Sequence, residues 1–191
     1  MNSNRLEAFS DGVLAIIITI MVLEMKAPEE ASFEALASII PVFVSYLMSF
    51  IYLGIYWNNH HHLLQVVKKV NGGILWANLY LLFWLSLIPF VTSWIGESQP
   101  EAIPVALYGA VLLMSSIAYR ILEVTLLRHD KNNSSLRQAI HKGLKETIST
   151  IAYLLVLPLA FVNIWISIGL FVFVAILWVI PDKRLEKAFH Q

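Results

Sequence analysis

Long apolar stretches separated by short polar segments dominate the chain. Each stretch is long enough for a membrane-spanning helix, since about 20 apolar residues cross a hydrocarbon core of about 30 Å. We therefore predict six spans, at roughly residues 5–25, 36–57, 74–95, 102–122, 146–162 and 164–181. The last two form a tight hairpin around Asn163, because one helix over residues 148–180 would be about 50 Å long, too long for the bilayer.

Composition supports an all-α integral membrane protein. Hydrophobic residues make up 58% of the chain, charged residues 14%, and mean hydropathy is +0.70, which is far from an ordinary soluble domain. Six spans fill residues 1–191 as a single membrane domain. The zero net charge gives no reason to expect a nucleic-acid partner, and the absence of cysteine excludes thiolate chemistry.

Positive charge predicts the orientation. With six spans and a cytoplasmic N-terminus, all but one of the 13 Lys and Arg residues lie on the inner side, the exception being Lys26. This asymmetry follows the positive-inside rule and places both termini in the cytoplasm. The outer loops are acidic, which either concentrates cations or simply solvates the loops.

The first span carries a stripe of side chains on one face. Residues three and four apart share a helix face, so Ile16, Thr19, Ile20 and Leu23 lie together. Such a stripe can face lipid or a protein core. In a symmetric oligomer with this helix nearest the axis, it would instead form apolar rings that gate by excluding water and one hydroxyl ring that contacts ions.

A polar cluster is predicted at the inner ends of the first three spans. Charged side chains at this depth are costly in lipid and need polar partners. Arg5, Ser10 and Asp11 lie at a depth similar to that of polar residues near the ends of spans two and three, including Asn58, Asn59, His60, His61, His62, Trp76 and Asn78. This cluster either locks span one in place or relays protons, and the sequence does not decide which of the three histidines joins it.

Metal and enzyme chemistry find little support. Consecutive helical residues point about 100° apart, so His60, His61 and His62 cannot hold one ion together; we expect no metal site and no cofactor. There is no nucleophile–base grouping and no phosphate-binding glycine loop, so we expect no enzyme. A carbonyl-lined potassium filter is excluded, because no T-V-G-Y-G-like segment is present.

The chain resembles a known channel family. Arg5, Phe9, Ser10 and Asp11 form an R-x-x-x-F-S-D pattern at the start of the first span. This pattern is similar to the signature of the transmembrane-protein-175 potassium channels, and the likeness to the prokaryotic single-repeat members extends through Tyr56-Trp57 and from Trp76 to Pro89-Phe90.

The resemblance implies a homotetramer in which the first helix of each subunit lines a central pore. It places the constrictions on Ile16, Ile20 and Leu23 and the potassium-preferring layer on Thr19. It also implies a structural network that contains Arg5, Phe9, Ser10, Asp11, His61, Trp76 and Asn78.

From the residues and the resemblance together, we expect a potassium-permeable cation channel in a cell membrane. Its partners would be copies of itself and the lipid bilayer, with potassium as the permeating ion. The alternative is a small proton-coupled transporter that uses Asp11 and a histidine of the inner vestibule.

Overall fold

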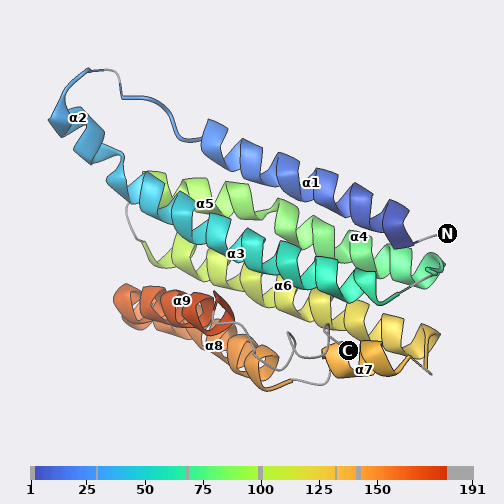
Figure 1. Cartoon of the computed structure of the whole chain (residues 1–191). Coiled ribbons are helices and arrows are strands. Elements are labelled where there is room, and N and C mark those ends of the chain that lie inside the picture. The colour runs from blue at the N-terminus through green and yellow to red at the C-terminus, as the bar shows by residue number, and fades with distance from the viewer. Residues whose placement is uncertain are drawn as a thin grey trace.

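The computed structural model describes residues 3–28, 30–67, 69–98, 101–131, 133–140 and 143–179. Within these ranges all the regular elements are α-helices (Figure 1). In chain order they are α1 (Ser3–Leu23), α2 (Phe33–Ser38), α3 (Ile40–Gln65), α4 (Gly72–Ser86), α5 (Ile88–Glu97), α6 (Ala102–His129), α7 (Ser134–Ile140), α8 (Gly143–Val162) and α9 (Ile164–Val179).

Among the described residues, five segments are long and apolar enough to cross a membrane. They are α1, α3, the pair α4–α5, α6 and α8 from Leu144 onwards. The predicted all-α membrane fold is therefore confirmed. The sixth predicted span corresponds to α9, which is apolar but covers only 16 described residues, so its crossing of the membrane stays a prediction.

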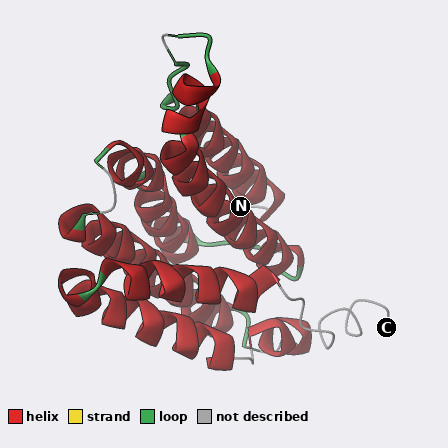
Figure 2. Cartoon of the chain, turned by 90° about the vertical axis from the view of Figure 1, so that its left-hand side faces the viewer, coloured by secondary structure: helices red, strands yellow, loops and turns green. Residues whose placement is uncertain are grey.

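The long helices run side by side as a bundle (Figure 1). Helix α1 lies along one edge, where it packs against α3, α4 and α5, while α6 packs against α4 on one side and α8 on the other. Helices α8 and α9 form the predicted hairpin. Viewed along the helices, α2 and the loop before it stand clear of the bundle (Figure 2).

Two helices continue beyond the ends we predicted. Helix α3 runs to Gln65 rather than to residue 57, and α6 runs to His129 rather than to residue 122. Polarity ends the apolar run but not the helix, because Asn, His and Arg have adequate helical propensity and no Gly or Pro interrupts either segment. The consecutive histidines therefore lie on a helix that faces other helices.

The third predicted span is broken at Leu87, between α4 and α5. Pro89 has no backbone N–H and its ring clashes with the carbonyl four residues earlier, so a continuous α-helix is disfavoured here. The chain responds with a tighter turn, in which the Leu87 N–H donates to the Trp84 carbonyl at 3.2 Å. Both halves of the broken span pack against α1.

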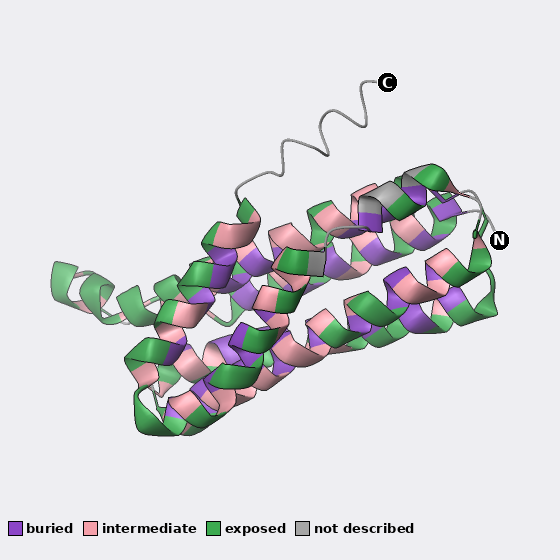
Figure 3. Cartoon of the chain, turned by 90° about the horizontal axis from the view of Figure 1, so that it is seen from below, coloured by how far each residue is buried: buried purple, intermediate pink, exposed green. Residues whose placement is uncertain are grey.

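Buried residues line the helix faces that meet inside the bundle, and exposed residues lie on the outer faces (Figure 3). Polar links reinforce the apolar packing: the buried Ser49 hydroxyl on α3 hydrogen-bonds to Thr92 on α5 (2.7 Å) and to Tyr108 on α6 (3.0 Å). Such interhelical bonds contribute about 0.6 kcal/mol each on average in membrane bundles.

Charge differs between the two ends of the bundle. The end that holds the start of α1 also holds the α3–α4 junction and α7 (Figure 1), and it carries Arg5, Lys69, Arg128, Lys131 and Arg137. Among the described basic residues only Lys26 lies at the opposite, acidic end. This supports the predicted orientation, although five residues that entered the charge argument lie outside the described ranges: Lys68, Lys142, Lys183, Arg184 and Lys187.

Candidate functional site

The two faces of helix α1 differ in burial and not in polarity. One face is buried against the rest of the subunit and repeats every three or four residues, as a helix face must. Its buried members are Ser3, Leu6, Ser10, Leu14, Ile17 and Met21. Both faces are mainly apolar, so the sequence pattern alone does not separate them.

The opposite face of α1 is largely exposed in the part of the subunit that the structure describes. It carries the four residues expected at the pore: Ile16 is 61% exposed, Ile20 42% and Leu23 73%, and Thr19 is also exposed. The Thr19 hydroxyl donates to the Ala15 carbonyl at 2.8 Å. Because its proton is used in this way, the oxygen of Thr19 has lone pairs available for an outside donor or cation.

A buried hydrogen-bonded chain joins α1 to α3 and α4. Ser10 donates to the Leu6 carbonyl (2.8 Å) and accepts from the Asn78 amide nitrogen (2.9 Å). The Asn78 amide oxygen in turn accepts from Nε2 of His60 (2.7 Å). Ser10, Asn78 and His60 are each at most 2% exposed, so this chain holds three helices together where unpaired polar groups would be costly.

A second set of contacts runs along the junction of α1 and α3. Trp57 Nε1 donates to the Asp11 carboxylate (3.0 Å), and Nδ1 of His61 pairs with the Glu7 carboxylate at 2.6 Å. Gln65 donates to the other ring nitrogen of His61 (2.7 Å). The two helices are antiparallel, so a four-residue step forward on α1 meets a four-residue step backward on α3.

The predicted network residues are only partly brought together. Ser10 and Asn78 meet directly, whereas Asp11 and His61 belong to the second set of contacts. The structure differs from expectation at Trp76, which is 75% exposed. The reason is geometric: Trp76 and Asn78 are two residues apart on α4, so they face directions about 200° apart.

Arg5 and Phe9 also lie on the outside of the subunit. Phe9 is 52% exposed, and Arg5 is exposed. Within the described residues, no hydrogen bond or ion pair joins Arg5 to Ser10 or Asp11. In one subunit, the signature residues therefore divide into an inward pair, Ser10 and Asp11, and an outward pair.

Our sequence analysis did not place Glu7, Trp57 or Gln65 in the network, and it left open which of the three consecutive histidines joins it. The signal was present, because Glu7 and Asp11 are four residues apart, as are Trp57, His61 and Gln65. These spacings place each set on one helix face. Pairing the two faces required the antiparallel contact of α1 with α3, which spacing does not reveal.

An open groove of about 870 Å³ lies between α1 and α5, beside the exposed face of α1. Its walls are mainly apolar, and two carboxylates belong to its lining. The residues that define it include Val13, Ile16, Ile20, Pro89, Phe90, Trp94, Glu24 and Glu97. Across the described part of the chain, no three His, Cys, Asp or Glu side chains come together as a metal site requires.

Comparison with known proteins gives consistent results. The family model described as "Endosomal/lysosomal potassium channel TMEM175" matches residues 5–89, which contain most of α1 and all of α2, α3 and α4. A protein of Chryseobacterium sp. (strain P1-3), named a potassium channel, is 59% identical over 191 residues and covers all of both chains.

A more distant relative from Chamaesiphon minutus, also named a potassium channel, is 29% identical over 187 residues, covering 87% of this chain and 88% of its own. Among solved structures, that of a lysosomal potassium-selective channel TMEM175 homologue from Chamaesiphon minutus is similar to the fold described above. The TM-score is 0.75 at 27% identity, covering 93% of this chain and 96% of that one.

Proposed function

Because the chain belongs to the TMEM175 family of ion channels, we propose that it is a potassium-permeable cation channel in a bacterial cell membrane. Membership of a channel family confirms that it is not an enzyme. The relatives named potassium channels support potassium as the permeating ion, and no cofactor is needed for passive permeation.

The observation that carries the proposal is the largely exposed face of α1. A single helix face that exposes Ile16, Ile20 and Leu23 along with a hydroxyl suits a position at the axis of a symmetric assembly. We infer a homotetramer in which four copies of α1 surround the conduction path. The apolar groove beside α1 supports contact with a neighbouring subunit on the same side.

In this assembly, Ile16, Ile20 and Leu23 form apolar rings that gate by excluding water, and no carbonyl-lined filter is used. Thr19 lies between Ile16 and Ile20 along the chain, and its hydroxyl ring replaces part of the hydration shell of potassium. Selectivity in this proposal comes from one layer of four side-chain oxygens.

The polar contacts at the base of α1 hold the pore helix at a fixed distance from the axis. Ser10 and Asn78, with Asp11 and His61, do so within the subunit. Arg5, Phe9 and Trp76 are exposed in the single subunit, and we assign them to contacts between neighbouring subunits.

Potassium flux into liposomes tests the proposal. Purified protein should carry a current that reverses near the potassium equilibrium potential and needs no proton gradient. Ile16→Asn hydrates one of the three proposed apolar rings and should increase the current, about tenfold if the barrier falls by about 1.4 kcal/mol. Thr19→Val keeps the side-chain shape and should reduce the preference for potassium over sodium.

Thr125→Val is the matched control, because Thr125 on α6 makes the same hydroxyl-to-backbone bond, to the Ile121 carbonyl at 2.7 Å. It should leave selectivity unchanged. Flux that appears only with a pH gradient would contradict the channel and support the transporter that uses Asp11 and an inner histidine. Fluxes unaffected by both α1 substitutions would rule out α1 as the pore lining.

A further inference from the structure

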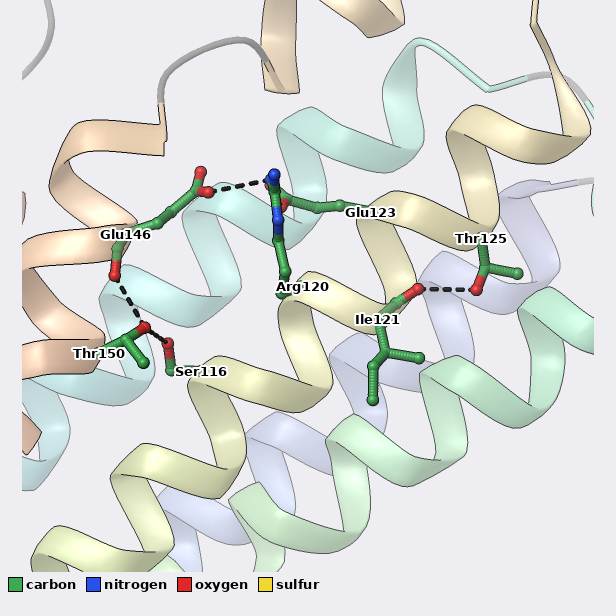
Figure 4. Close-up of polar contacts among 7 residues, drawn as sticks. All are labelled: Ser116, Arg120, Ile121, Glu123, Thr125, Glu146 and Thr150. Carbon is green, nitrogen blue, oxygen red and sulfur yellow. Dashed lines mark hydrogen bonds and ion pairs between the residues drawn. The ribbon is translucent and has the colours of Figure 1, made fainter. Parts of the chain in front are cut away.

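A second polar site lies between α6 and α8, on the side of the bundle away from α1. Arg120 on α6 reaches toward two carboxylates through the same guanidinium nitrogen (Figure 4). Its Nη1 is 2.9 Å from Oε2 of Glu123 and 3.2 Å from Oε2 of Glu146 on α8. None of these residues belongs to the proposed pore or to its anchoring network.

The charges in this cluster do not balance. Arg120 is the one basic side chain among the described residues that line the adjacent cavity, and it faces two carboxylates. Glu123 has a side chain only 4% exposed and Glu146 one 21% exposed, so water solvates them poorly. The two carboxylates share one guanidinium, whose side chain is 52% exposed, and incomplete compensation of a buried charge is unfavourable. One further positive charge, or one proton on a carboxylate, would neutralise the cluster.

The cavity beside the cluster has room for a molecule that brings this charge. Its volume is about 270 Å³, and α3, α6, α8 and α9 form its walls. Most of the lining is apolar, with a few hydrogen-bond acceptors, which is the usual composition of a small-molecule site. The hydroxyls of Ser116 and Thr150 hydrogen-bond to each other at 3.0 Å beside Glu146 (Figure 4).

The lining favours an organic cation over a metal ion. Arg120 lies within hydrogen-bonding distance of both carboxylates, so a divalent ion placed between them would be repelled at close range. The cavity wall also includes the aromatic side chains of Tyr56, Tyr119 and Trp178. Aromatic faces attract ammonium groups and at the same time cover the apolar body that carries them.

We propose that this cavity is a binding site for a small organic monocation, a primary ammonium on an apolar body. The ammonium group donates to the Glu146 carboxylate and to the hydroxyl oxygens of Ser116 and Thr150. The apolar body packs against Tyr56, Tyr119 and Trp178. The site is independent of the proposed channel function, since none of its residues lies on α1.

Isothermal titration calorimetry on the purified full-length protein in lipid nanodiscs tests the site with two ligands of one shape. 2-Phenylethylammonium carries the charge, and 2-phenylethanol replaces it with a neutral hydroxyl. The ammonium should bind at least about tenfold more tightly than the alcohol, the difference that about 1.4 kcal/mol of charge recognition produces. Equal affinities, or no binding of the ammonium at millimolar concentration, would overturn the proposal.

Glu146→Gln removes the acceptor charge while Arg120 keeps its bond to Glu123. It should weaken 2-phenylethylammonium at least about tenfold and leave 2-phenylethanol unchanged. Glu34→Gln is the matched control, because Glu34 is exposed on α2, and it should have no effect. Unchanged ammonium affinity in Glu146→Gln would also overturn the proposal, and the comparison of ligands on the unmodified protein decides the question if this variant does not fold.

Discussion

At the scale of single residues, Asn78 holds the most consequential position, because its one amide serves both Ser10 on α1 and His60 on α3. Asn78→Leu has a similar volume, but it removes the hydrogen bond that Ser10 accepts and leaves Nε2 of the buried His60 without its acceptor. A buried group that loses its partner costs about 1–3 kcal/mol. We expect a melting temperature several degrees lower in detergent, measured by a thermal unfolding assay.

Asn58→Leu is the control for this change. Asn58 lies on α3 near His60, but its side chain is exposed, and exposed substitutions usually change stability by less than about 0.5 kcal/mol. Equal destabilisation by the two variants would mean that the buried chain through Asn78 does not hold α1 in place.

The sequence predicted part of the membership of the polar cluster, but not its pairing. Depth alone brought Ser10, Asp11 and Asn78 together, because charged and amide groups at one level of a bilayer need one another. Depth does not say which way a side chain points around its helix. Trp76 was therefore expected in the cluster, and it lies on the outer face of α4.

At the scale of helices, one close approach between backbones involves Gly96. A Cβ atom at this position on α5 would lie 2.9 Å from the Val42 Cα on α3. The obstructing atom belongs to the backbone, so the two helices would have to move apart. Overpacking of this kind costs about 1–3 kcal/mol, and Gly96→Ala should lower the melting temperature accordingly.

Gly54→Ala provides the comparison within α3. No heavy atom lies within 4 Å of a Cβ at Gly54, and alanine is favoured over glycine inside a helix by about 0.5–1 kcal/mol. Its melting temperature should be unchanged or higher. A drop as large as that of Gly96→Ala would show that the contact with Val42 is not the cause.

The sequence largely predicted where the helices lie, but it did not predict where they end. Each predicted span overlaps a described helix or, at residues 74–95, the pair α4–α5. Apolar length ended α3 and α6 too early, because hydrophobicity reports where lipid can be and not where backbone hydrogen bonds stop. The break at Leu87 follows from Pro89, although tertiary contacts decide how a proline-containing helix adjusts.

At the scale of the whole molecule, the proposed tetramer predicts contacts that one subunit cannot make. The chain contains no cysteine, so any disulfide from a single introduced cysteine must join two subunits. Leu23 is 73% exposed on the face assigned to the axis. Leu23→Cys should give dimers on oxidation, seen on a non-reducing gel, because disulfides require Cα atoms within about 7 Å.

Val162→Cys is the matched control on α8. Val162 is 78% exposed and is the last residue of α8, a helix on the side of the bundle away from α1 (Figure 1). It should stay monomeric under the same oxidation. Dimers from Val162→Cys but not from Leu23→Cys would mean that the end of α8, and not α1, lies near the symmetry axis.

The sequence by itself determined that this is a membrane protein, and it gave the number and rough position of the apolar segments and the asymmetry of the charges. Through the R-x-x-x-F-S-D pattern it also indicated the family. These properties depend on composition and on local order, which need no partner residue. The tertiary structure decided which face of α1 is buried, which histidine meets Asn78 and that Arg120 faces two carboxylates. These features depend on how each helix is rotated toward its neighbours. The helices are apolar on nearly every side, so the hydrophobic pattern does not predict that rotation.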